Sequence, residues 1–119
     1  MIIGIGTDVV EISRMMKSIE NSGFLKRYFT DAENEYFMLK KYSPQTISAS
    51  FAAKEAVSKA FGTGFRGFNL KDIEVLHDNF GKPYIKLYNN AQKLADGGKI
   101  HISLTHTENF ACAFAILEK

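Results

Sequence analysis

The chain has 119 residues, of which 45% are hydrophobic and 24% are charged, and its formal net charge at pH 7 is +2. This length and composition are typical of one globular domain, which we expect to span residues 1–119. The weak positive charge argues against nucleic acid as the partner, and the single cysteine, Cys112, excludes an internal disulfide and a multi-cysteine metal cluster. Cys112 lies in an apolar run, so we expect it in the core.

The N-terminus carries no targeting signature. Residues 1–3 lead directly into Gly4, with neither the basic segment nor the apolar stretch of a signal peptide. No apolar run in the sequence is long enough to cross a bilayer. We therefore expect a cytoplasmic protein that does not bind membranes.

The first predicted element is a buried strand over residues 2–6, an apolar run interrupted by glycines that other backbone or a ligand can approach closely. We expect this strand to end at Asp8, next to a short helix that begins near Glu11. Asp8 would then be either a cap of that helix or a ligand, and caps are the more common of the two. Helical spacing continues over residues 13–28, with a break at 21–23.

Two further helices have recognisable ends. Thr30 followed by Glu33 is a capping arrangement that opens a helix through Leu39. The longest helix is predicted over residues 45–61, because this alanine-rich stretch contains no Gly or Pro, follows a proline and precedes a glycine.

One face of this long helix carries unlike charges. At about 100° per residue, a single stripe contains two small residues, one carboxylate and one ammonium, which we interpret as a shallow trough: Ser48, Ala52, Glu55 and Lys59. The opposite face, with residues 53, 56, 57 and 60, would contact a core. The alternative is a solvated ion pair between Glu55 and Lys59, which contributes only about 0.2 to 0.5 kcal/mol.

The C-terminal half favours strands. Residues 72–77 and 84–87 partly alternate apolar and polar side chains around a hairpin loop, and residues 100–106 and 110–117 form the arms of a last hairpin. A short helix over residues 89–95 lies between the two pairs. This order of elements predicts an α+β fold with a mainly antiparallel sheet and a long central helix.

Four segments together resemble the 4′-phosphopantetheinyl transferases, and within that superfamily the short bacterial holo-acyl-carrier-protein synthases. They are Gly4-Ile-Gly-Thr-Asp8, the stretch from Phe51-Ala-Ala-Lys-Glu55 to Gly62-Thr-Gly64, Gly81-Lys-Pro83 and Ile102-Ser-Leu-Thr-His-Thr107. The motifs occur in the family's order along nearly the whole chain. The resemblance implies the phosphopantetheinyl transferase fold and transfer of the 4′-phosphopantetheine arm of coenzyme A to a serine of apo acyl carrier protein, with release of adenosine 3′,5′-bisphosphate.

The resemblance also implies roles for particular residues. Asp8 and Glu55 match magnesium ligands, and hard carboxylate oxygens suit Mg²⁺ beside a diphosphate. Lys59 matches a catalytic lysine that contacts phosphate, and Arg14 matches a residue that meets the acidic carrier protein. Further positions correspond to groups that contact coenzyme A: Gly62, Gly64, Lys82, Pro83, His106 and Thr107. A homotrimer with coenzyme A bound between subunits is implied as well.

Three points stay open from the residues alone. The general base is either Glu55 or His106. Many relatives carry an arginine where this chain has Ser50, so either Lys54 or Arg66 contacts the ribose phosphate of the coenzyme instead, or that contact is weaker. The remaining histidines match no role in the family: His77 and His101.

Two other function classes fit parts of the sequence. A non-enzymatic coenzyme-binding module would use the same loops without a metal. A small RNA-binding domain would use the basic and aromatic residues 26–29 and Arg66, but the net charge is weak and the sequence has no RNP-like or KH-like motif. For an acidic carrier protein we predict a basic docking patch that consists of Arg14, Lys17, Lys26 and Arg27.

Overall fold

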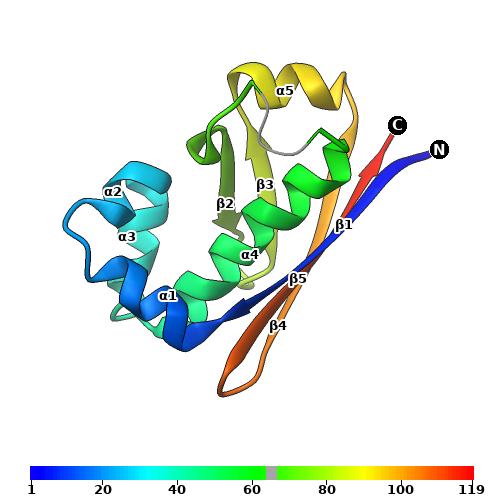
Figure 1. Cartoon of the computed structure of the whole chain (residues 1–119). Helices are drawn as coiled ribbons and strands as arrows, with labels where there is room; N and C mark the ends of the chain where they lie inside the picture. Colours follow the sequence, from blue (N-terminus) through cyan, green and yellow to red (C-terminus); the bar gives the residue numbers. More distant parts are fainter. Residues whose placement is uncertain (64–66) are drawn as a thin grey trace.

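The protein folds as two antiparallel sheets around one central helix (Figure 1). It is a computed structural model that describes residues 1–63 and 67–119. Strand β1 (Ile2–Glu11) begins the chain and is followed by helices α1 (Ile12–Ile19), α2 (Phe24–Tyr28), α3 (Asp31–Leu39) and α4 (Pro44–Phe61). After the 3₁₀ turn η1 (Leu70–Asp72) come β2 (Ile73–His77), β3 (Pro83–Leu87), α5 (Asn89–Ala95), β4 (Lys99–His106) and β5 (Phe110–Glu118).

The larger sheet has the strand order β1-β5-β4, and β2 and β3 form a separate hairpin. All three pairings are antiparallel. Helix α4 packs across the larger sheet and also contacts β2, so it lies between the two sheets (Figure 1). The α+β fold predicted from the sequence, with its antiparallel sheet and long central helix, is confirmed.

Helix α4 begins and ends where its sequence predicts. The Ser43 side chain accepts a hydrogen bond from the Thr46 N–H, and Pro44 occupies the first turn. At the other end, Gly62 has a φ of 78°, a left-handed conformation that glycine adopts without strain. Most α4 side chains are buried, so the helix is held by contacts around most of its circumference.

Two glycines of β1 allow α4 to lie directly on the strand. A Cβ atom at Gly4 would lie 1.9 Å from the Ala60 carbonyl oxygen, and a Cβ atom at Gly6 would lie 1.9 Å from the Ala56 carbonyl oxygen. The glycine-interrupted run therefore reflects close approach of backbone to backbone, as predicted. Because side chains alternate along a strand, the even-numbered residues of β1 face α4 and the odd-numbered residues face away from it.

Two features of this region differ from the prediction. Strand β1 does not end at Asp8 but continues to Glu11, because residues 9–11 pair with β5 in the same register. Asp8 therefore lies inside the strand and caps no helix. The predicted trough along α4 is also shorter than expected, since Ser48 and Ala52 are fully buried and the stripe reaches solvent only near its C-terminal end.

The other predicted elements agree with the structure to within one residue at each end. Thr30 and Glu33 form the predicted capping box: Thr30 Oγ1 accepts a hydrogen bond from the Glu33 N–H at 3.2 Å, and Glu33 Oε1 accepts one from the Thr30 N–H at 2.9 Å. The helix over residues 89–95 and the two hairpins are confirmed as well. In residues 1–63 and 67–119, no helix is long and apolar enough to cross a membrane.

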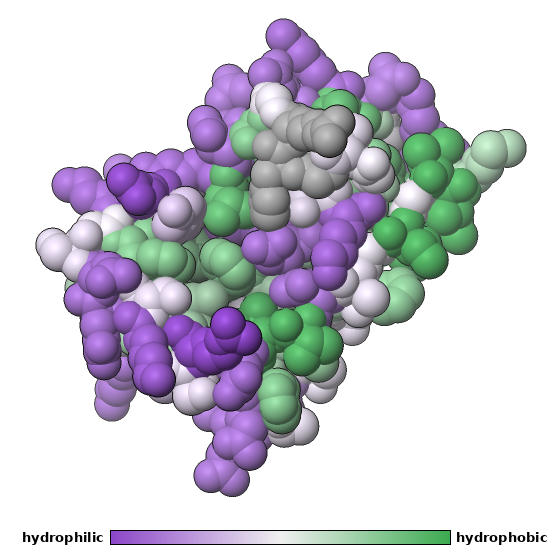
Figure 2. Space-filling view, viewed as in Figure 1, coloured by the Kyte–Doolittle hydropathy of each residue, from purple (hydrophilic) through white to green (hydrophobic). Residues whose placement is uncertain are grey.

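The face of the larger sheet opposite α4 is apolar and exposed. It carries odd-numbered side chains of β1 and even-numbered side chains of β5, among them Ile3, Ile5, Val9, Phe110 and Phe114. In Figure 2, hydrophobic side chains gather along the side of the molecule where these two strands run. Cys112 lies on the same face and is only half-buried, so the expectation that it belongs to the core is wrong.

Candidate functional site

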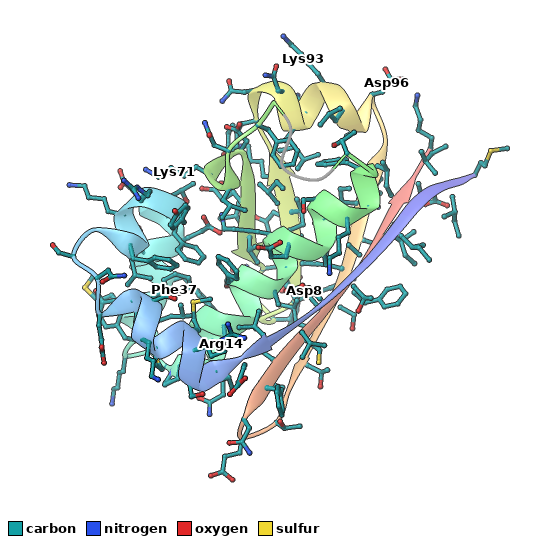
Figure 3. The ribbon with its side chains drawn as sticks, in the orientation of Figure 1. Asp8, Arg14, Phe37, Lys71, Lys93 and Asp96 are labelled. Atoms are coloured by element: carbon teal, nitrogen blue, oxygen red, sulfur yellow. The ribbon has the colours of Figure 1, made fainter. Side chains whose placement is uncertain are left out.

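Three predicted site residues meet where α4 crosses β1. Asp8 faces the helix from the strand, and Lys59 Nζ donates to Asp8 Oδ1 at 3.1 Å and to the Thr7 carbonyl oxygen at 2.9 Å. The Asp8 side chain is 16% exposed and the Lys59 side chain is 54% exposed, so the pair lies at the protein surface. Figure 3 shows Asp8 beside α4. The fold thus joins two residues that are 51 positions apart in the sequence.

Glu55 lies one helical turn before Lys59 and completes this group, which we call the carboxylate cluster (Asp8, Glu55 and Lys59). The pKa of Glu55 is raised by its partial burial and by the charge of Asp8, and Lys59 acts in the opposite direction. Asp8 and Glu55 are therefore close enough to repel each other, and a cation relieves that repulsion. Among the described residues Lys59 forms its ion pair with Asp8 rather than with Glu55, so the alternative of a solvated i,i+4 pair is wrong.

The carboxylate cluster suits Mg²⁺ better than a transition metal. Asp8 and Glu55 supply hard oxygen donors from two different elements of the fold. Within residues 1–63 and 67–119, no group of three or more His, Cys, Asp or Glu side chains is arranged to hold a metal. Zinc sites normally need three or four such ligands, whereas Mg²⁺ is commonly held by one or two carboxylates together with phosphate oxygens and water. The donor set therefore fits Mg²⁺.

A cleft of 490 Å³ lies between the N-terminal half of α4, the β2–β3 turn and β4, and we call it the β4 cleft. Among the residues that line it are Ser50, Lys82, Pro83 and His106. The turn itself is held by Asp78, whose Oδ1 accepts a hydrogen bond from the Lys82 N–H at 2.9 Å. The fold thus brings the Gly81-Lys-Pro83 motif together with His106.

Within one chain, the predicted site residues lie in two separate places. The carboxylate cluster lies at the β1 edge of the larger sheet and the β4 cleft lies at the opposite edge, with β5 between them. Among the described residues that line the β4 cleft, none belongs to the carboxylate cluster. The described part of a single chain therefore does not bring the two groups together in this cleft.

The other predicted positions are spread over the molecule. Gly62 ends α4 beside the carboxylate cluster, and its N–H donates to the Lys59 carbonyl oxygen at 3.0 Å. Thr107 closes the β4–β5 turn, where its Oγ1 accepts a hydrogen bond from the Phe110 N–H at 3.1 Å. Arg14 is exposed on α1 (Figure 3). Two positions lie outside the described residues: Gly64 and Arg66.

A model of the 4′-phosphopantetheinyl transferase superfamily matches residues 4–115. The chain belongs to this superfamily. The holo-[acyl-carrier-protein] synthase of Clostridium botulinum (strain Eklund 17B) is 54% identical over 121 residues, which cover 99% of this chain and 98% of the relative. The corresponding synthase of Clostridium novyi is 49% identical over 122 residues, with coverage of 99% and 88%.

Solved structures of holo-[acyl-carrier-protein] synthases share the fold. The Bacillus anthracis enzyme in complex with CoA (3′,5′-ADP) has a TM-score of 0.86 at 34% identity, and the match covers 100% of this chain and 98% of that one. The Neisseria meningitidis enzyme has a TM-score of 0.91 at 32% identity, with 100% coverage of both chains. The resemblance inferred from the four motifs, and with it the prediction of a transferase enzyme, is confirmed.

In this phosphopantetheinyl transferase, Lys54 is not available to bind a phosphate. Its side chain is fully buried, and its ammonium donates to Glu33 Oε1 at 2.8 Å and to two backbone carbonyl oxygens. Of the alternatives left open by Ser50, the one in which Lys54 contacts the ribose phosphate is therefore wrong. The lysine reads as a surface charge in the sequence because nothing local to it indicates a buried carboxylate partner.

The transferase also has a histidine in the β4 cleft, His77, that matches no role in the family. His77 lines the β4 cleft and stacks on Tyr36, with ring centroids 4.0 Å apart. Burial and the nearby charge of Lys40 lower the pKa of His77, so its ring is neutral at pH 7. In the sequence, the position of His77 just before the Gly81-Lys-Pro83 motif could have indicated that its side chain lines the cleft. His101, by contrast, pairs with Glu118 at 2.9 Å on the face of the sheet that points away from α4.

Proposed function

We propose that the chain is a holo-[acyl-carrier-protein] synthase. This enzyme would transfer the 4′-phosphopantetheine group of coenzyme A to a serine hydroxyl of apo acyl carrier protein, require Mg²⁺ and release adenosine 3′,5′-bisphosphate. Residues 1–119 would act as one transferase domain. The observation that carries the proposal is the carboxylate cluster, in which Asp8 and Glu55 converge beside Lys59 in a member of the superfamily.

Lys59 is suited to contact the diphosphate of coenzyme A. Its ammonium has three N–H donors, of which two are used by Asp8 Oδ1 and the Thr7 carbonyl oxygen. These two bonds hold the ammonium in one position, and the third donor can reach a phosphate oxygen. Mg²⁺, when bound by Asp8 and Glu55, supplies positive charge that stabilises the diphosphate as its P–O bond breaks.

Glu55 is the better candidate for the base that takes the serine proton. Lys59 pairs with Asp8 rather than with Glu55, so Glu55 is the carboxylate of the cluster that is left to accept the serine proton. His106, the alternative, lies in the β4 cleft with Lys82 and Pro83 rather than beside Asp8. In that cleft His106 is better suited to bind a phosphate of the coenzyme than to remove a proton.

The β4 cleft is the proposed site for the nucleotide end of coenzyme A. Lys82 offers a cation for phosphate, His106 and Ser50 offer hydrogen-bonding groups, and Pro83 offers an apolar surface for the adenine ring. Contacts from the backbone next to His106, at Thr107, and at the end of α4, at Gly62, complete the proposed coenzyme site, and the resemblance implies a further contact from Gly64, which lies outside the described residues.

The proposed active form is a homotrimer with each site between two subunits. The carboxylate cluster and the β4 cleft lie at opposite edges of one sheet, so a site that uses both needs a second copy of the chain. The exposed sheet face with Ile5, Val9 and Phe114 is typical of a surface that assembly covers. Contacts between one edge and the opposite edge of the next copy are heterologous, and such contacts form a closed ring when the rotation between copies closes.

The proposed partner is an acidic apo acyl carrier protein that docks on α1 and α2. These two helices contact each other and present exposed basic side chains: Arg14, Lys17, Lys26 and Arg27. Complementary charge of this kind raises the rate of association and selects the partner.

Intact-mass spectrometry tests the proposed function directly. The protein is incubated with coenzyme A, Mg²⁺ and an apo acyl carrier protein, and the carrier protein should gain the mass of one phosphopantetheine group. EDTA should prevent the gain. Coenzyme A binding without any gain in mass would instead favour a non-enzymatic coenzyme-binding module, and binding of RNA alone would favour the RNA-binding alternative.

A further inference from the structure

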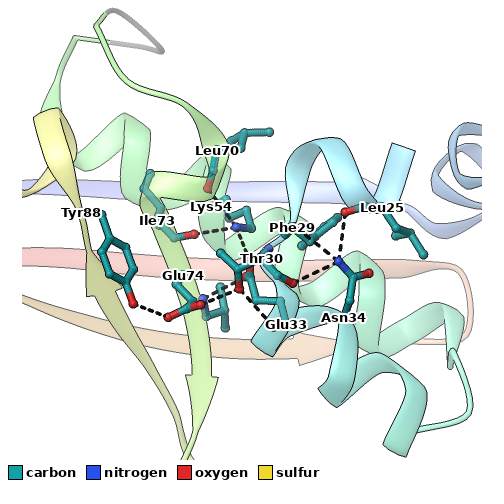
Figure 4. A network of polar contacts seen from close by, with 11 residues as sticks. Leu25, Phe29, Thr30, Glu33, Asn34, Lys54, Leu70, Ile73, Glu74 and Tyr88 are labelled. Carbon is teal, nitrogen blue, oxygen red and sulfur yellow. Dashed lines mark hydrogen bonds and ion pairs between the residues drawn. The ribbon is translucent and has the colours of Figure 1, made fainter. Parts of the chain in front are cut away.

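A buried ion pair joins α3 to α4, one residue before Glu55 (Figure 4). Lys54 Nζ donates to Glu33 Oε1 at 2.8 Å, and the two side chains are 0% and 1% exposed. The same ammonium donates to the Leu70 carbonyl oxygen at 2.9 Å and to the Ile73 carbonyl oxygen at 2.6 Å. All three N–H donors of Lys54 are therefore used.

Glu33 is held equally firmly on its own side. Besides the bond from Lys54, its carboxylate accepts hydrogen bonds from the Thr30 N–H at 2.9 Å and from the Val75 N–H at 3.0 Å. Four elements meet at this one ion pair: α3, α4, η1 and β2. The direction of the Lys54 side chain is thus fixed by groups on three elements outside its own helix.

This ion pair is a poor source of stability. Burial raises the pKa of Glu33 and lowers the pKa of Lys54, because it disfavours the charged form of each. Replacing a buried ion pair by apolar side chains of similar volume is often neutral or stabilising. An ammonium with three fixed acceptors, however, makes all its bonds in only one position, whereas apolar contacts tolerate small rotations. The main effect of the pair is therefore geometric.

The side of α4 that faces β1 is held more loosely, because its side-chain bonds to that strand, among the described residues, come from Lys59, which is half-exposed. There the helix lies on Gly4 and Gly6, which have no side chains to interdigitate with it. Such a contact allows close approach but specifies the rotation of the helix about its axis only weakly. Consecutive residues of a helix point about 100° apart, so the direction of Lys54 determines the direction of Glu55.

We infer that the Lys54–Glu33 pair is a positioning device that sets the rotation of α4 and thereby directs Glu55 towards Asp8. The inference rests on the proposed function, because it concerns the geometry of the same carboxylate cluster. Lys54 and Glu33 bond to each other and to backbone groups rather than to the carboxylate cluster, so both are positioning residues.

The test combines Lys54→Met with Glu33→Gln, which removes both charges and keeps side chains of similar length. Each single replacement leaves one buried charge without its partner, so each single variant should unfold at a lower urea concentration than the double variant. The folded double variant should bind Mg²⁺ at least tenfold more weakly in calorimetric titrations without substrate. Its kcat should fall at least tenfold, with little change in the KM for coenzyme A.

Tyr88→Phe is the matched control. It removes the hydrogen bond from the Tyr88 hydroxyl to Glu74 Oε1, which is 2.8 Å long and belongs to the same polar network (Figure 4). This bond joins β2 to the residue before α5 and leaves the bonds of Lys54 unchanged. The control variant should therefore lose some stability while keeping wild-type Mg²⁺ affinity and kcat.

A crystal structure of the double variant provides a readout that depends on neither metal nor activity. We expect α4 to be rotated so that the bond from Lys59 Nζ to Asp8 Oδ1 is lost. An unrotated α4 with this bond intact would overturn the inference, and so would wild-type Mg²⁺ affinity and kcat in the double variant. Wild-type protein that transfers no phosphopantetheine would refute the proposed function instead, and the crystal structure would still decide the positioning role.

Discussion

Lys59 of helix α4 donates a hydrogen bond of 3.1 Å to Asp8 of strand β1, and the pKa of the neighbouring Glu55 is raised by burial and by the charge of Asp8. The ammonium is therefore a built-in cation beside two carboxylates that repel each other. A divalent ion bound by the same two carboxylates relieves the same repulsion. Lys59 and the divalent ion thus compete for the carboxylate of Asp8.

Lys59→Met should bind Mg²⁺ about three- to tenfold more tightly than the wild type in the absence of substrate, because it removes a half-exposed positive charge beside Asp8. The same variant should lose roughly a hundredfold or more in kcat, because its contact to the diphosphate is missing. Calorimetry measures the first effect and a transfer assay the second. The control is Lys93→Met, which removes an exposed lysine of α5 and should change neither Mg²⁺ affinity nor kcat. Weaker Mg²⁺ binding by Lys59→Met would contradict the competition between Lys59 and Mg²⁺ for Asp8.

Glu55→Gln should stabilise the metal-free protein at neutral pH. The folded pKa of Glu55 is raised above 4.5, so the ionised carboxylate destabilises the fold as the pH rises through that folded pKa. Below about pH 4.5 the carboxyl is protonated in both states and the advantage of the variant disappears. Urea denaturation in EDTA at several pH values measures the difference. An equal difference at all pH values would mean that the charge of Glu55 is not its cause.

Gly6→Ala should separate α4 from β1. The new Cβ would lie 1.9 Å from the Ala56 carbonyl oxygen, so the helix has to move away from the strand that carries Asp8. Overpacking of this kind costs about 1 to 3 kcal/mol of unfolding free energy, and we also expect weaker Mg²⁺ binding because Asp8 and Glu55 move apart. Urea denaturation and calorimetry measure the two effects. If the unfolding free energy of Gly6→Ala equals that of the wild type, α4 and β1 can move apart at little energetic cost.

The structure shows which parts of this site follow from local sequence. The ends of α4 are predictable because Ser43, Pro44 and Gly62 act within one helical turn. The meeting of Asp8 with Glu55 is not local, and it was expected only because both belong to motifs of a known family; the bond from Lys59 to Asp8 was not predicted. The length of β1 was underestimated, because residues 9–11 become a strand by pairing with β5 about a hundred positions away.

Burial was the property that the sequence predicted least well. Lys54 and Glu33 both look like solvated charges, and only the tertiary fold makes them partners in the interior. Ser48 and Ala52 look like the floor of an open trough for a related reason. Helical periodicity identifies residues on the same face, but it does not show whether other elements of the fold cover that face.

Arg14→Glu should weaken the interaction with the carrier protein selectively. Arg14 is exposed on α1, whereas the carboxylate cluster and the β4 cleft lie on other elements. Charge reversal should raise the KM for apo acyl carrier protein several-fold, more so at low salt, and leave the KM for coenzyme A nearly unchanged. Steady-state kinetics with each substrate varied in turn provides the measurement. An equal rise in both KM values would argue against a docking role for Arg14.

Mixing two inactive variants tests whether the carboxylate cluster and the β4 cleft of different subunits form one site. Asp8→Asn disables the cluster and His106→Ala disables the cleft, so each variant alone should have little activity. If subunits exchange freely, a shared site is intact when one subunit has a normal Asp8 and its neighbour has a normal His106. Each condition holds for half of the subunits in an equal mixture, so about a quarter of the sites, and of the wild-type activity, should return.

The control for this mixture is Asp8→Asn with Lys59→Met, because both replacements affect the same cluster and no arrangement of subunits restores it. The mixtures are prepared by co-expression, and size-exclusion chromatography with light scattering checks that they assemble equally. Recovery in the first mixture alone requires that α4 of one subunit and β4 of another act on the same coenzyme. Absence of recovery in both, with normal assembly, would argue against a site that is shared between subunits.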